Sequence, residues 1–562
     1  MATRRGRTVE HSARHAARVD VPRAFNAASY FVDRQAIEGR ERRTALVGED
    51  HEFDYGDVAR GVNRMGNALR ALGVRMEERV VLVLPDVPEF VYAFWGAMKI
   101  GAVPVPVNTR LTPRDYAYIL DDTRATTAVV SETHAASIES VRGSLRFLRH
   151  LIVVGAATEP QLAFDTLIDS ASAELDPAPT TSDDAAFWLY SSGTTGTPKG
   201  VIHLHHDMVA CCHGFGRHVL EIGEDDRCFS VAKLFFAYGL GNALYYPFWV
   251  GASTVLDAAH PEPARVFQIM DRTRPTLFFA VPTAFAALLR EATQTGRQTL
   301  GGVRRCFSAG EPLPKALYER WRARFGVEIL DGIGSTEMCH TFIANRAGAA
   351  RPGSSGTLVP GYDAMIVDDA GRAVPDGELG HLLVSGDSCC AGYWNQHERT
   401  KSAITGAWIR TGDTYRRDAD GYFWYAGRAD DMIKAGGIWV SPAEVESALI
   451  EHEAVLEAGV VGVADEDELI KPVAFVVLAD GYDASPALEH TLRAFVKERI
   501  APFKCPRRVV FIDALPKTAT GKIQRYRLRE MAGAARPGTA AAAPQSGAST
   551  SARSSDASSA TL

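Results

Sequence analysis

Short apolar runs rich in β-branched residues alternate along the chain with longer amphipathic segments. This order recurs where the chain passes from 80–84 to a helical pattern at Pro88, from 113–122 to 127–131, from 277–281 to 282–293, and from 314–324 to 327–330. Apolar runs of strand length that alternate with helical segments are typical of βαβ units. The pattern therefore predicts an α/β fold with mostly parallel sheets.

The most apolar stretch, residues 90–107, contains Lys99, two glycines and two prolines. These residues interrupt it too often for a membrane span. We interpret it as a buried helix that Asp86 opens, because Glu89 follows at the spacing of a capping box. Gly101 is suited to the end of that helix.

A domain boundary is expected near Arg428, after the aromatic strand 421–427. Ser441, Pro442 and Glu444 then have the pattern of a helix start with a capping box. The runs 458–463 and 472–478, the helical stretch 487–500 and the strand 508–512 complete an α+β module of about 100 residues, a common domain size. We therefore predict an N-terminal domain at 23–428 and a C-terminal domain at 429–535.

The two ends of the chain have a different composition from the body. Residues 1–22 are polar and basic, and residues 536–562 are almost all Ala, Ser, Thr, Gly and Pro. Such segments bury too little apolar surface to offset the entropy of ordering them. Both are predicted to be disordered.

Composition and charge exclude several classes of protein. The 562 residues include 61 basic and 68 acidic side chains, a net charge of −7, which argues against a non-specific nucleic-acid binder. The eight cysteines form no C-x-x-C pair, so a disulfide framework or a zinc ribbon is not expected. The N-terminus has no apolar run of a secretory signal. We expect a cytoplasmic protein with no nucleic-acid or membrane partner.

The strongest local motif is Y-S-S-G-T-T-G-T-P-K-G at residues 190–200, directly after the apolar run 185–190. Glycines let backbone amides approach a ligand, and the hydroxyls and one ammonium add donors, a combination that suits a polyphosphate. It is not a Walker A loop, because Pro198 follows Gly193 by five residues, where that motif has glycine. The residues expected to bind phosphate are Ser191, Ser192, Gly193, Thr194, Thr195, Gly196 and Lys199.

With the motifs below, this loop resembles the adenylate-forming superfamily of acyl-CoA synthetases over about residues 25–528. The segments K-L-F-F-A-Y-G-L-G-N at 233–242 and L-D-G-I-G-S-T-E-M at 330–338 are most similar to benzoate-CoA ligases. The resemblance implies a large N-terminal domain of subdomains and a small mobile C-terminal domain. It also implies a ligase that uses ATP, Mg²⁺ and coenzyme A.

The same resemblance assigns the nucleotide site. Adenine would lie near Ala309, Gly310 and Glu311, and near Asp331, Gly332 and Ile333. The family often has an aromatic residue where Ile333 stands, so the resemblance implies that apolar contact with adenine would replace ring stacking here. Thr336 would contact phosphate, Glu337 would hold Mg²⁺, Asp413 would bind the ribose hydroxyls, and Arg428 would contact the nucleotide.

The resemblance also assigns moving parts. Asp430 would be the hinge between the domains, and Lys522, in P-K-T-A-T-G-K-I at 516–523, would bridge the substrate carboxylate and the α-phosphate. Gly436 and Gly437 would face the pantetheine tunnel. The remaining contacts to coenzyme A would come from Trp439, Lys471, Lys504 and Arg507.

The acid pocket is expected at Phe236, Ala237 and Tyr238, with Gly334 and His340, where aromatic residues suit a flat ring. The pocket segment has no acidic residue to pair with an ammonium, which disfavours an amino acid as substrate. His340 is either a substrate contact or a core histidine. A metal site at the nearby cluster of His203, His205, His206, Cys211, Cys212 and His213 is disfavoured, because its spacing matches no standard zinc motif.

We therefore expect an aryl-CoA ligase that converts benzoate or a simple substituted benzoate into an acyl-adenylate and then a CoA thioester, releasing pyrophosphate and AMP. One alternative is a CoA ligase for another cyclic, aryl-alkenoic or medium-chain acid. Another is an adenylating enzyme that loads a separate carrier protein. An inactive nucleotide-binding protein is disfavoured by the presence of Lys522, Glu337 and Asp413. The ring substituents and a homodimeric state are left open.

Overall fold

The computed structural model describes residues 19–191, 198–428, 431–435, 438–464, 470–517 and 523–534. The segments predicted to be disordered are 1–22 and 536–562, and of these residues 1–18 and 536–562 lie outside the described ranges. Val19 and Val21, which the sequence placed in the disordered N-terminus, are instead half-buried against the core, so that part of the prediction is wrong.

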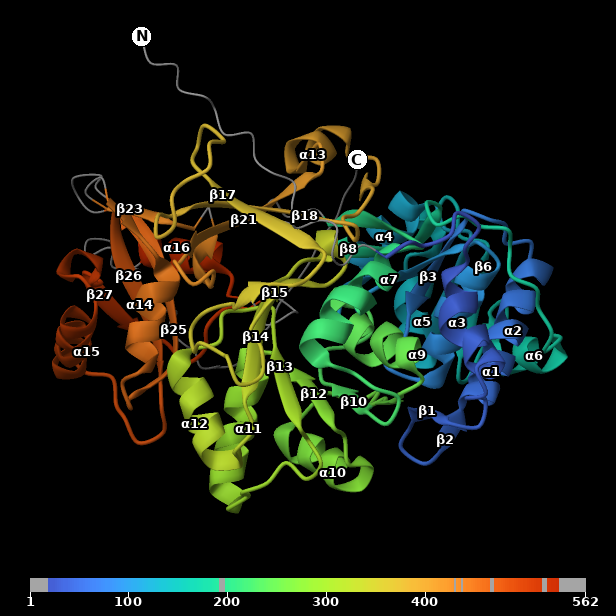
Figure 1. The fold of residues 1–562 in the computed structure, drawn as a ribbon, viewed down its shortest axis with the longest axis horizontal. Coiled ribbons are helices and arrows are strands. Elements are labelled where there is room, and N and C mark those ends of the chain that lie inside the picture. Colours follow the sequence, from blue (N-terminus) through green and yellow to red (C-terminus); the bar gives the residue numbers. More distant parts are fainter. Residues whose placement is uncertain are drawn as a thin grey trace, which may run out of the picture.

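A nine-stranded sheet lies at the centre of the molecule (Figure 1). Its order is β16 (Thr357–Leu358), β15 (Thr341–Ala344), β14 (Ile329–Gly334), β13 (Arg305–Ser308), β12 (Leu277–Ala280), β10 (Arg227–Ser230), β11 (Ser253–Val255), β1 (Thr44–Val47) and β2 (Glu52–Asp54). The strands from β14 to β1 are parallel, and both edges are antiparallel. This confirms the predicted fold class.

Alternate residues of the strands in this sheet face two different cores. Phe278 and Cys306 pack with the helices α10 (Pro263–Thr273), α11 (Pro282–Thr295) and α12 (Lys315–Phe325). Phe279 and Phe307 belong to the largest core on the opposite face. A parallel sheet that is buried on both faces requires the continuous apolar strands that the sequence shows.

A second sheet is parallel throughout, in the order β4 (Val103–Pro106), β3 (Arg79–Val83), β5 (Thr127–Ser131), β6 (His150–Val154) and β7 (Leu162–Ala163). The helices joined to it are α2 (Tyr55–Ala71), α3 (Pro88–Lys99), α4 (Pro113–Thr123), α5 (Glu132–Glu139) and α6 (Phe164–Ser170). Helix α3 ends before Gly101, as predicted, and its apolar residues are buried. No helix within the described ranges is long and apolar enough to cross a membrane.

The predicted capping box at Asp86 is wrong. Val87 is the N-cap residue of α3, and no side chain caps that end. The Asp86 carboxylate instead accepts a hydrogen bond from Leu234 N at 2.9 Å and lies 3.8 Å from Lys233 Nζ. Burial raises the pKa of Asp86 to about 6 despite the opposing effect of Lys233. The tertiary contact replaces the local one and ties the start of segment 233–242 to the second sheet.

Antiparallel sheets complete the N-terminal part. The strands β8 (Ala185–Ser191), β9 (Lys199–Leu204) and β19 (Gly392–Tyr393) form one of them. Another contains β17 (Tyr362–Val367), β18 (Gly380–Gly386), β20 (Ile404–Thr405), β21 (Trp408–Arg417) and β22 (Phe423–Arg428), and α13 (His397–Ala403) lies beside it.

The C-terminal part has its own core. It consists of β23 (Ile433–Ala435), β24 (Ile438–Val440), α14 (Pro442–Ile450), β25 (Val455–Ala464), β26 (Ile470–Leu478), α15 (Pro486–Arg499), β27 (Arg508–Phe511) and α16 (Arg525–Ala534). Ser441 caps α14 by accepting from Glu444 N at 3.2 Å. The Glu444 carboxylate lies 2.6 Å from Lys504 Nζ, so a different partner takes the second half of the expected capping box.

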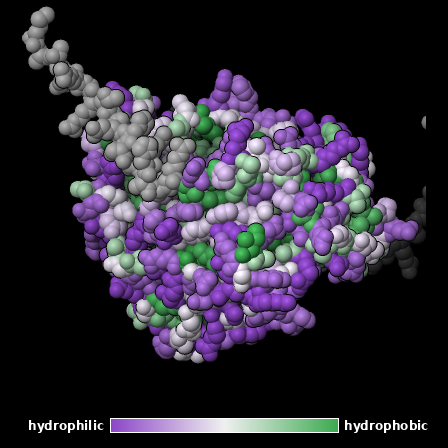
Figure 2. Space-filling model, turned by 45° about the vertical axis from the view of Figure 1, so that its right-hand side comes forward, coloured by the Kyte–Doolittle hydropathy of each residue, from purple (hydrophilic) through white to green (hydrophobic). Residues whose placement is uncertain are grey.

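The surface is mixed and predominantly polar. In Figure 2, hydrophilic residues cover most of the visible face and hydrophobic ones are scattered among them. All eight cysteines are free, in agreement with the absence of a disulfide framework from the sequence.

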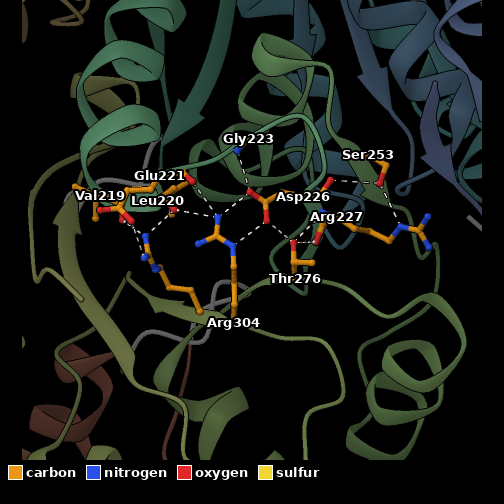
Figure 3. Close-up of polar contacts among 10 residues, drawn as sticks. Val219, Leu220, Glu221, Gly223, Asp226, Arg227, Ser253, Thr276 and Arg304 are labelled. Atoms are coloured by element: carbon orange, nitrogen blue, oxygen red, sulfur yellow. Dashed lines mark hydrogen bonds and ion pairs between the residues drawn. The ribbon is translucent and has the colours of Figure 1, made fainter. Parts of the chain in front are cut away.

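A buried carboxylate joins the amino ends of three parallel strands (Figure 3). Asp226, just before β10, accepts from Thr276 Oγ1 at 2.6 Å and from Arg304 Nη2 at 2.7 Å. Thr276 directly precedes β12, and Arg304 directly precedes β13. Burial alone raises the pKa of Asp226, but the hydrogen bonds from Arg304, Thr276 and the Gly223 amide outweigh it and lower the pKa.

We predict that Asp226→Asn destabilises the N-terminal domain by about 1–3 kcal/mol at pH 7. The amide is uncharged, and it offers Arg304 and Thr276 one accepting oxygen where the carboxylate offers two. A carboxylate with a lowered folded pKa stabilises above its unfolded pKa of about 3.9 and loses this contribution as the pH falls through the folded value. The difference between the wild type and the variant should therefore shrink below about pH 4. Urea unfolding, followed by tryptophan fluorescence, measures both quantities.

Asp225→Asn is the matched control. Its carboxylate is 91% exposed and lies 2.9 Å from Arg43, so its loss should cost less than about 1 kcal/mol. Equal losses in the two variants at pH 7 would contradict the role given to Asp226.

Candidate active site

The predicted ligand-binding segments lie at the carboxyl ends of neighbouring parallel strands. Segment 309–312 follows β13, and β14 runs into the short 3₁₀ helix η5 (Thr336–Met338). Ligands of open α/β sheets bind outside the carboxyl ends of the strands. The structure therefore brings Ala309, Gly310 and Glu311 to the same edge as Asp331, Gly332 and Ile333. Gly310 has φ +93°, a conformation that favours glycine.

Asp331 lies inside this edge rather than on its surface. Its side chain accepts from Leu313 N at 3.3 Å and is buried. Burial raises the pKa of Asp331 well above its usual value. The contact fixes the segment after β13 against β14.

A charged cluster forms where η5 meets β9 and β19. Lys199 Nζ lies 2.8 Å from Glu337 Oε1 and donates to Tyr393 Oη at 2.8 Å. Tyr393 Oη in turn donates to Glu337 Oε1 at 3.0 Å. Burial acts to raise the pKa of Glu337, but the Lys199 ammonium and the Tyr393 hydroxyl lower it. The carboxylate is therefore held ionised beside a cation.

A buried histidine, His203, contacts the backbone of η5 beside this cluster. His203 Nδ1 lies 2.7 Å from Asp207 Oδ2, and His203 Nε2 lies 2.7 Å from Thr336 O. Both side chains are fully buried. His203 therefore fixes the backbone of η5, and the described residues contain no cluster of three or more metal ligands.

Asp413 and Arg428 also meet. They are opposite each other in the β21–β22 pair, with Arg428 Nη1 3.1 Å from Asp413 Oδ1. The same nitrogen donates to Thr411 O at 3.2 Å. The Asp413 side chain is 13% exposed and that of Arg428 is 40% exposed, so both are reachable from solvent.

The residues predicted for the acid pocket converge. Phe236 and Ala237 lie at the start of α8 (Ala237–Leu240), and Tyr238 Oη donates to Phe307 O at 2.8 Å. His340 Nε2 lies 3.2 Å from Tyr238 O. A side chain at Gly334 would come within 2.6 Å of His340 O, so glycine is required for this approach.

His340 lies in an aromatic environment. Its ring centroid is 4.9 Å from that of Tyr246, 5.2 Å from that of Phe215 and 5.6 Å from that of Tyr238. Burial lowers the pKa of His340 to about 3, so the ring is neutral at physiological pH. Phe215 belongs to the π-helical segment η3 (Cys212–Leu220), and Tyr246 directly follows a second one, η4 (Gly241–Tyr245). Such segments are frequent at functional sites.

Several predicted residues lie outside the described ranges: Ser192, Gly193, Thr194, Thr195, Gly196, Asp430, Gly436, Gly437 and Lys522. Their described flanks are paired, since Ser191 faces Lys199 across β8 and β9, and Lys517 forms a bridge with Ile523. Trp439 lies in β24 and Lys471 in β26. Lys504, a weaker candidate for coenzyme A binding, is paired with Glu444.

Sequence reasoning missed Tyr393. It is separated from Lys199 by 194 residues, and no local pattern links the two. Tyr393 lies between Gly392 and Trp394, and this glycine-aromatic triplet is the sequence feature that could have marked it as a candidate site residue.

Comparisons with known proteins agree with this arrangement. Residues 32–394 match the family model described as AMP-binding enzyme, and residues 444–522 match the AMP-binding enzyme C-terminal domain. The chain is 48% identical over 515 residues to benzoate–CoA ligase of Thauera aromatica, covering 91% of this chain and 97% of the relative. It is 47% identical over 510 residues to 4-hydroxybenzoate–CoA/benzoate–CoA ligase of Rhodopseudomonas palustris, covering 91% and 94%.

A solved structure is similar to this chain in both fold and sequence. The anthranilate CoA ligase AuaEII in complex with anthranoyl-AMP has a TM-score of 0.88 and 43% sequence identity, over 92% of this chain and 98% of that chain. The similarity extends through both parts of the fold.

Proposed function

The chain belongs to the AMP-binding enzyme family, and from this premise we propose that it is an ATP-dependent ligase that joins benzoate or a simple substituted benzoate to coenzyme A. One observation carries the proposal: a charged cluster at Glu337 and a neutral aromatic pocket at His340 lie three residues apart on one turn. The first suits a polyphosphate with its cation, and the second suits an uncharged ring.

The donor set fits Mg²⁺. This ion is usually held by one or two carboxylates together with substrate phosphates, rather than by a cage of protein ligands. Glu337 supplies such a carboxylate, and its lowered pKa keeps it ionised. When bound, Mg²⁺ supplies positive charge to the phosphate oxygens. Lys199, which neutralises Glu337 here, supplies a second cation for phosphate.

In the first half-reaction the substrate carboxylate attacks the α-phosphorus of ATP, and pyrophosphate leaves. Negative charge builds up on the phosphate oxygens, so the task of the protein is positioning and electrostatic stabilisation. We assign this stabilisation to Lys199, Thr336 and Lys522, together with the loop residues Ser191 to Gly196. Asp413 and Arg428 would hold the ribose side, and the adenine would lie against Gly310 and Ile333.

In the second half-reaction the thiol of coenzyme A attacks the carbonyl carbon of the acyl-adenylate, and AMP leaves. Lys522 has no role in this step, so the C-terminal domain is free to rotate about Asp430. Gly436 and Gly437 would then line the pantetheine tunnel, with Trp439 and Lys471 near the nucleotide of coenzyme A. One site thus serves both half-reactions.

A hydroxy- or aminobenzoate is the second candidate substrate. His340 faces the Tyr238 carbonyl through Nε2, which makes Nε2 the donor and Nδ1 an acceptor. Nδ1 is buried and has no hydrogen-bond partner within the described part of the chain. An acid with a donor group on its ring could satisfy this nitrogen, and the two relatives named for 4-hydroxybenzoate and anthranilate support this choice.

The direct test measures pyrophosphate release with ATP, Mg²⁺, coenzyme A and one acid at a time. The panel is benzoate, 2-aminobenzoate, 4-hydroxybenzoate, cinnamate and hexanoate, with products identified by mass. We expect the highest kcat/KM for a benzoate and a CoA ester as product. Preference for hexanoate or cinnamate would favour the other ligase class, and free adenylate in the presence of coenzyme A would favour carrier loading.

Lys522→Ala should lower the rate of adenylation by at least about 100-fold, because a cation is removed from the developing charge. Thioester formation from supplied benzoyl-adenylate should stay within a few-fold of the wild type. Lys517→Ala is the control, since Lys517 lies in the same loop and is paired with Glu457 at 2.8 Å. Equal losses in both half-reactions would remove the role assigned to Lys522.

Tyr393→Phe should lower kcat/KM for adenylation by about tenfold and raise the Mg²⁺ concentration needed for half-maximal rate. The ring remains beside the Lys199 ammonium, 4.0 Å from its centroid, but the hydroxyl that orients Glu337 is lost. Tyr422→Phe is the control, because that hydroxyl donates to Ala349 O at 2.7 Å and its ring lies beside Arg351. An unchanged Mg²⁺ dependence in Tyr393→Phe would contradict this role.

A further inference from the structure

The turn between the charged cluster and the acid pocket has a strained backbone. Cys339 has φ +64° and ψ −43°, and His340 N donates to Met338 O at 2.7 Å across it. These values and this bond define a γ-turn with positive φ, which is rare for a residue that carries a β-carbon. Strained conformations persist only where the surrounding structure imposes them.

Three neighbouring carbonyls in this turn each accept a hydrogen bond from another part of the chain. Thr336 O lies 2.7 Å from His203 Nε2, and Glu337 O accepts from Cys390 N at 2.8 Å. Met338 O accepts from Ser388 Oγ at 2.8 Å. The segment 388–390 therefore holds two of the three carbonyls.

Ser388 is itself oriented by a buried tyrosine. Tyr362 Oη lies 2.8 Å from Ser388 Oγ, and since Ser388 uses its proton on Met338 O, Tyr362 is the donor. Cys211 Sγ lies 3.6 Å from Tyr362 Oη and 3.9 Å from Met338 O. Ser388, Cys211 and Met338 have no exposed surface, so water cannot replace these contacts.

We propose that Ser388 is a positioning residue for the adenylation step, which rests on the function proposed above. It acts through the Met338 carbonyl to hold the turn at Cys339. The turn sets the distance between the Glu337 carboxylate, on the nucleotide side, and the His340 ring, on the acid side. Fixing this distance aligns the substrate carboxylate with the α-phosphorus.

A role in stability alone does not explain why the Ser388 hydroxyl donates to Met338 O. Met338 O already accepts from His340 N, so it would stay satisfied without Ser388. The hydroxyl therefore adds a further donor, beside the weak Cys211 thiol, to a carbonyl whose bond to His340 N closes the strained turn. Its removal should release the turn geometry more than it lowers overall stability.

The test compares Ser388→Ala with Ser253→Ala. Ser253 is also buried, and its hydroxyl lies 3.5 Å from Asp226 O at the opposite edge of the central sheet. We use pyrophosphate release with the best acid from the wild-type panel, and measure kcat, KM for the acid and KM for ATP. We expect Ser388→Ala to lower kcat/KM for the acid at least tenfold and to change the kcat/KM ratio of benzoate to 4-hydroxybenzoate. Ser253→Ala should stay within twofold in both.

The selectivity ratio does not depend on the fraction of folded enzyme, so a merely structural loss would leave it unchanged. Ser388→Cys keeps a weak donor and should recover part of the loss, and Tyr362→Phe should shift the ratio in the same direction as Ser388→Ala. The proposal would be overturned if Ser388→Ala kept the wild-type kcat/KM and the wild-type selectivity ratio. If Ser388→Ala does not fold, the same result in Tyr362→Phe would overturn it. Failure of the proposed function is recognised separately, because the wild type itself would then release no pyrophosphate with any aromatic acid.

Discussion

The site depends on keeping the half-buried carboxylate of Glu337 ionised. A buried carboxylate loses its hydration and takes up a proton unless a cation and hydrogen-bond donors compensate for that loss. Glu337 has both, in the Lys199 ammonium and the Tyr393 hydroxyl. These partners come from β9 and β19, which pair with each other, and Glu337 comes from the end of the central sheet. The junction of the two sheets therefore supplies the partners that stabilise the ionised Glu337 carboxylate.

Charged side chains play different roles at the amino and carboxyl ends of the strands in the central sheet. At the amino ends of the strands, Asp226 is held by Arg304, Thr276 and a backbone amide, and those contacts lower its pKa. That arrangement is complete and serves stability. At the carboxyl ends, Lys199 and Glu337 neutralise each other in a pair whose members each suit a different part of a magnesium-bound polyphosphate. When ligand binds, Lys199 can pair with phosphate and Glu337 with the metal ion in place of each other. The ion pair between Asp226 and Arg304 needs no such exchange.

The parts of the structure that the sequence predicted are those set by local pattern. The strand predicted at 127–131 is β5, and the helix predicted from Pro282 is α11, because burial on both faces and a proline at the first turn are visible locally. The helix start at Asp86 failed because Leu234 N, 148 residues away, takes the carboxylate. Tyr393 and Ser388 were missed for the same reason, since their partners lie far along the chain. The roles of Glu337, Asp413 and Lys522 came from resemblance to a family, and the pairing of Asp413 with Arg428 was not foreseen.

The short turn from Glu337 to His340 separates two environments with opposite requirements. The pocket that we propose for the acid is aromatic and neutral, because burial keeps His340 uncharged. The side that we propose for the phosphates needs concentrated charge, which Lys199 and Glu337 carry. An apolar wall beside the charges strengthens their interaction with phosphate, since Coulomb energies grow as the local dielectric falls. The wall must also be rigid, because a shift of the ring relative to the phosphate would misalign the attacking carboxylate. A strained turn whose carbonyls accept hydrogen bonds from other segments meets this requirement for rigidity, because those contacts restrict its geometry.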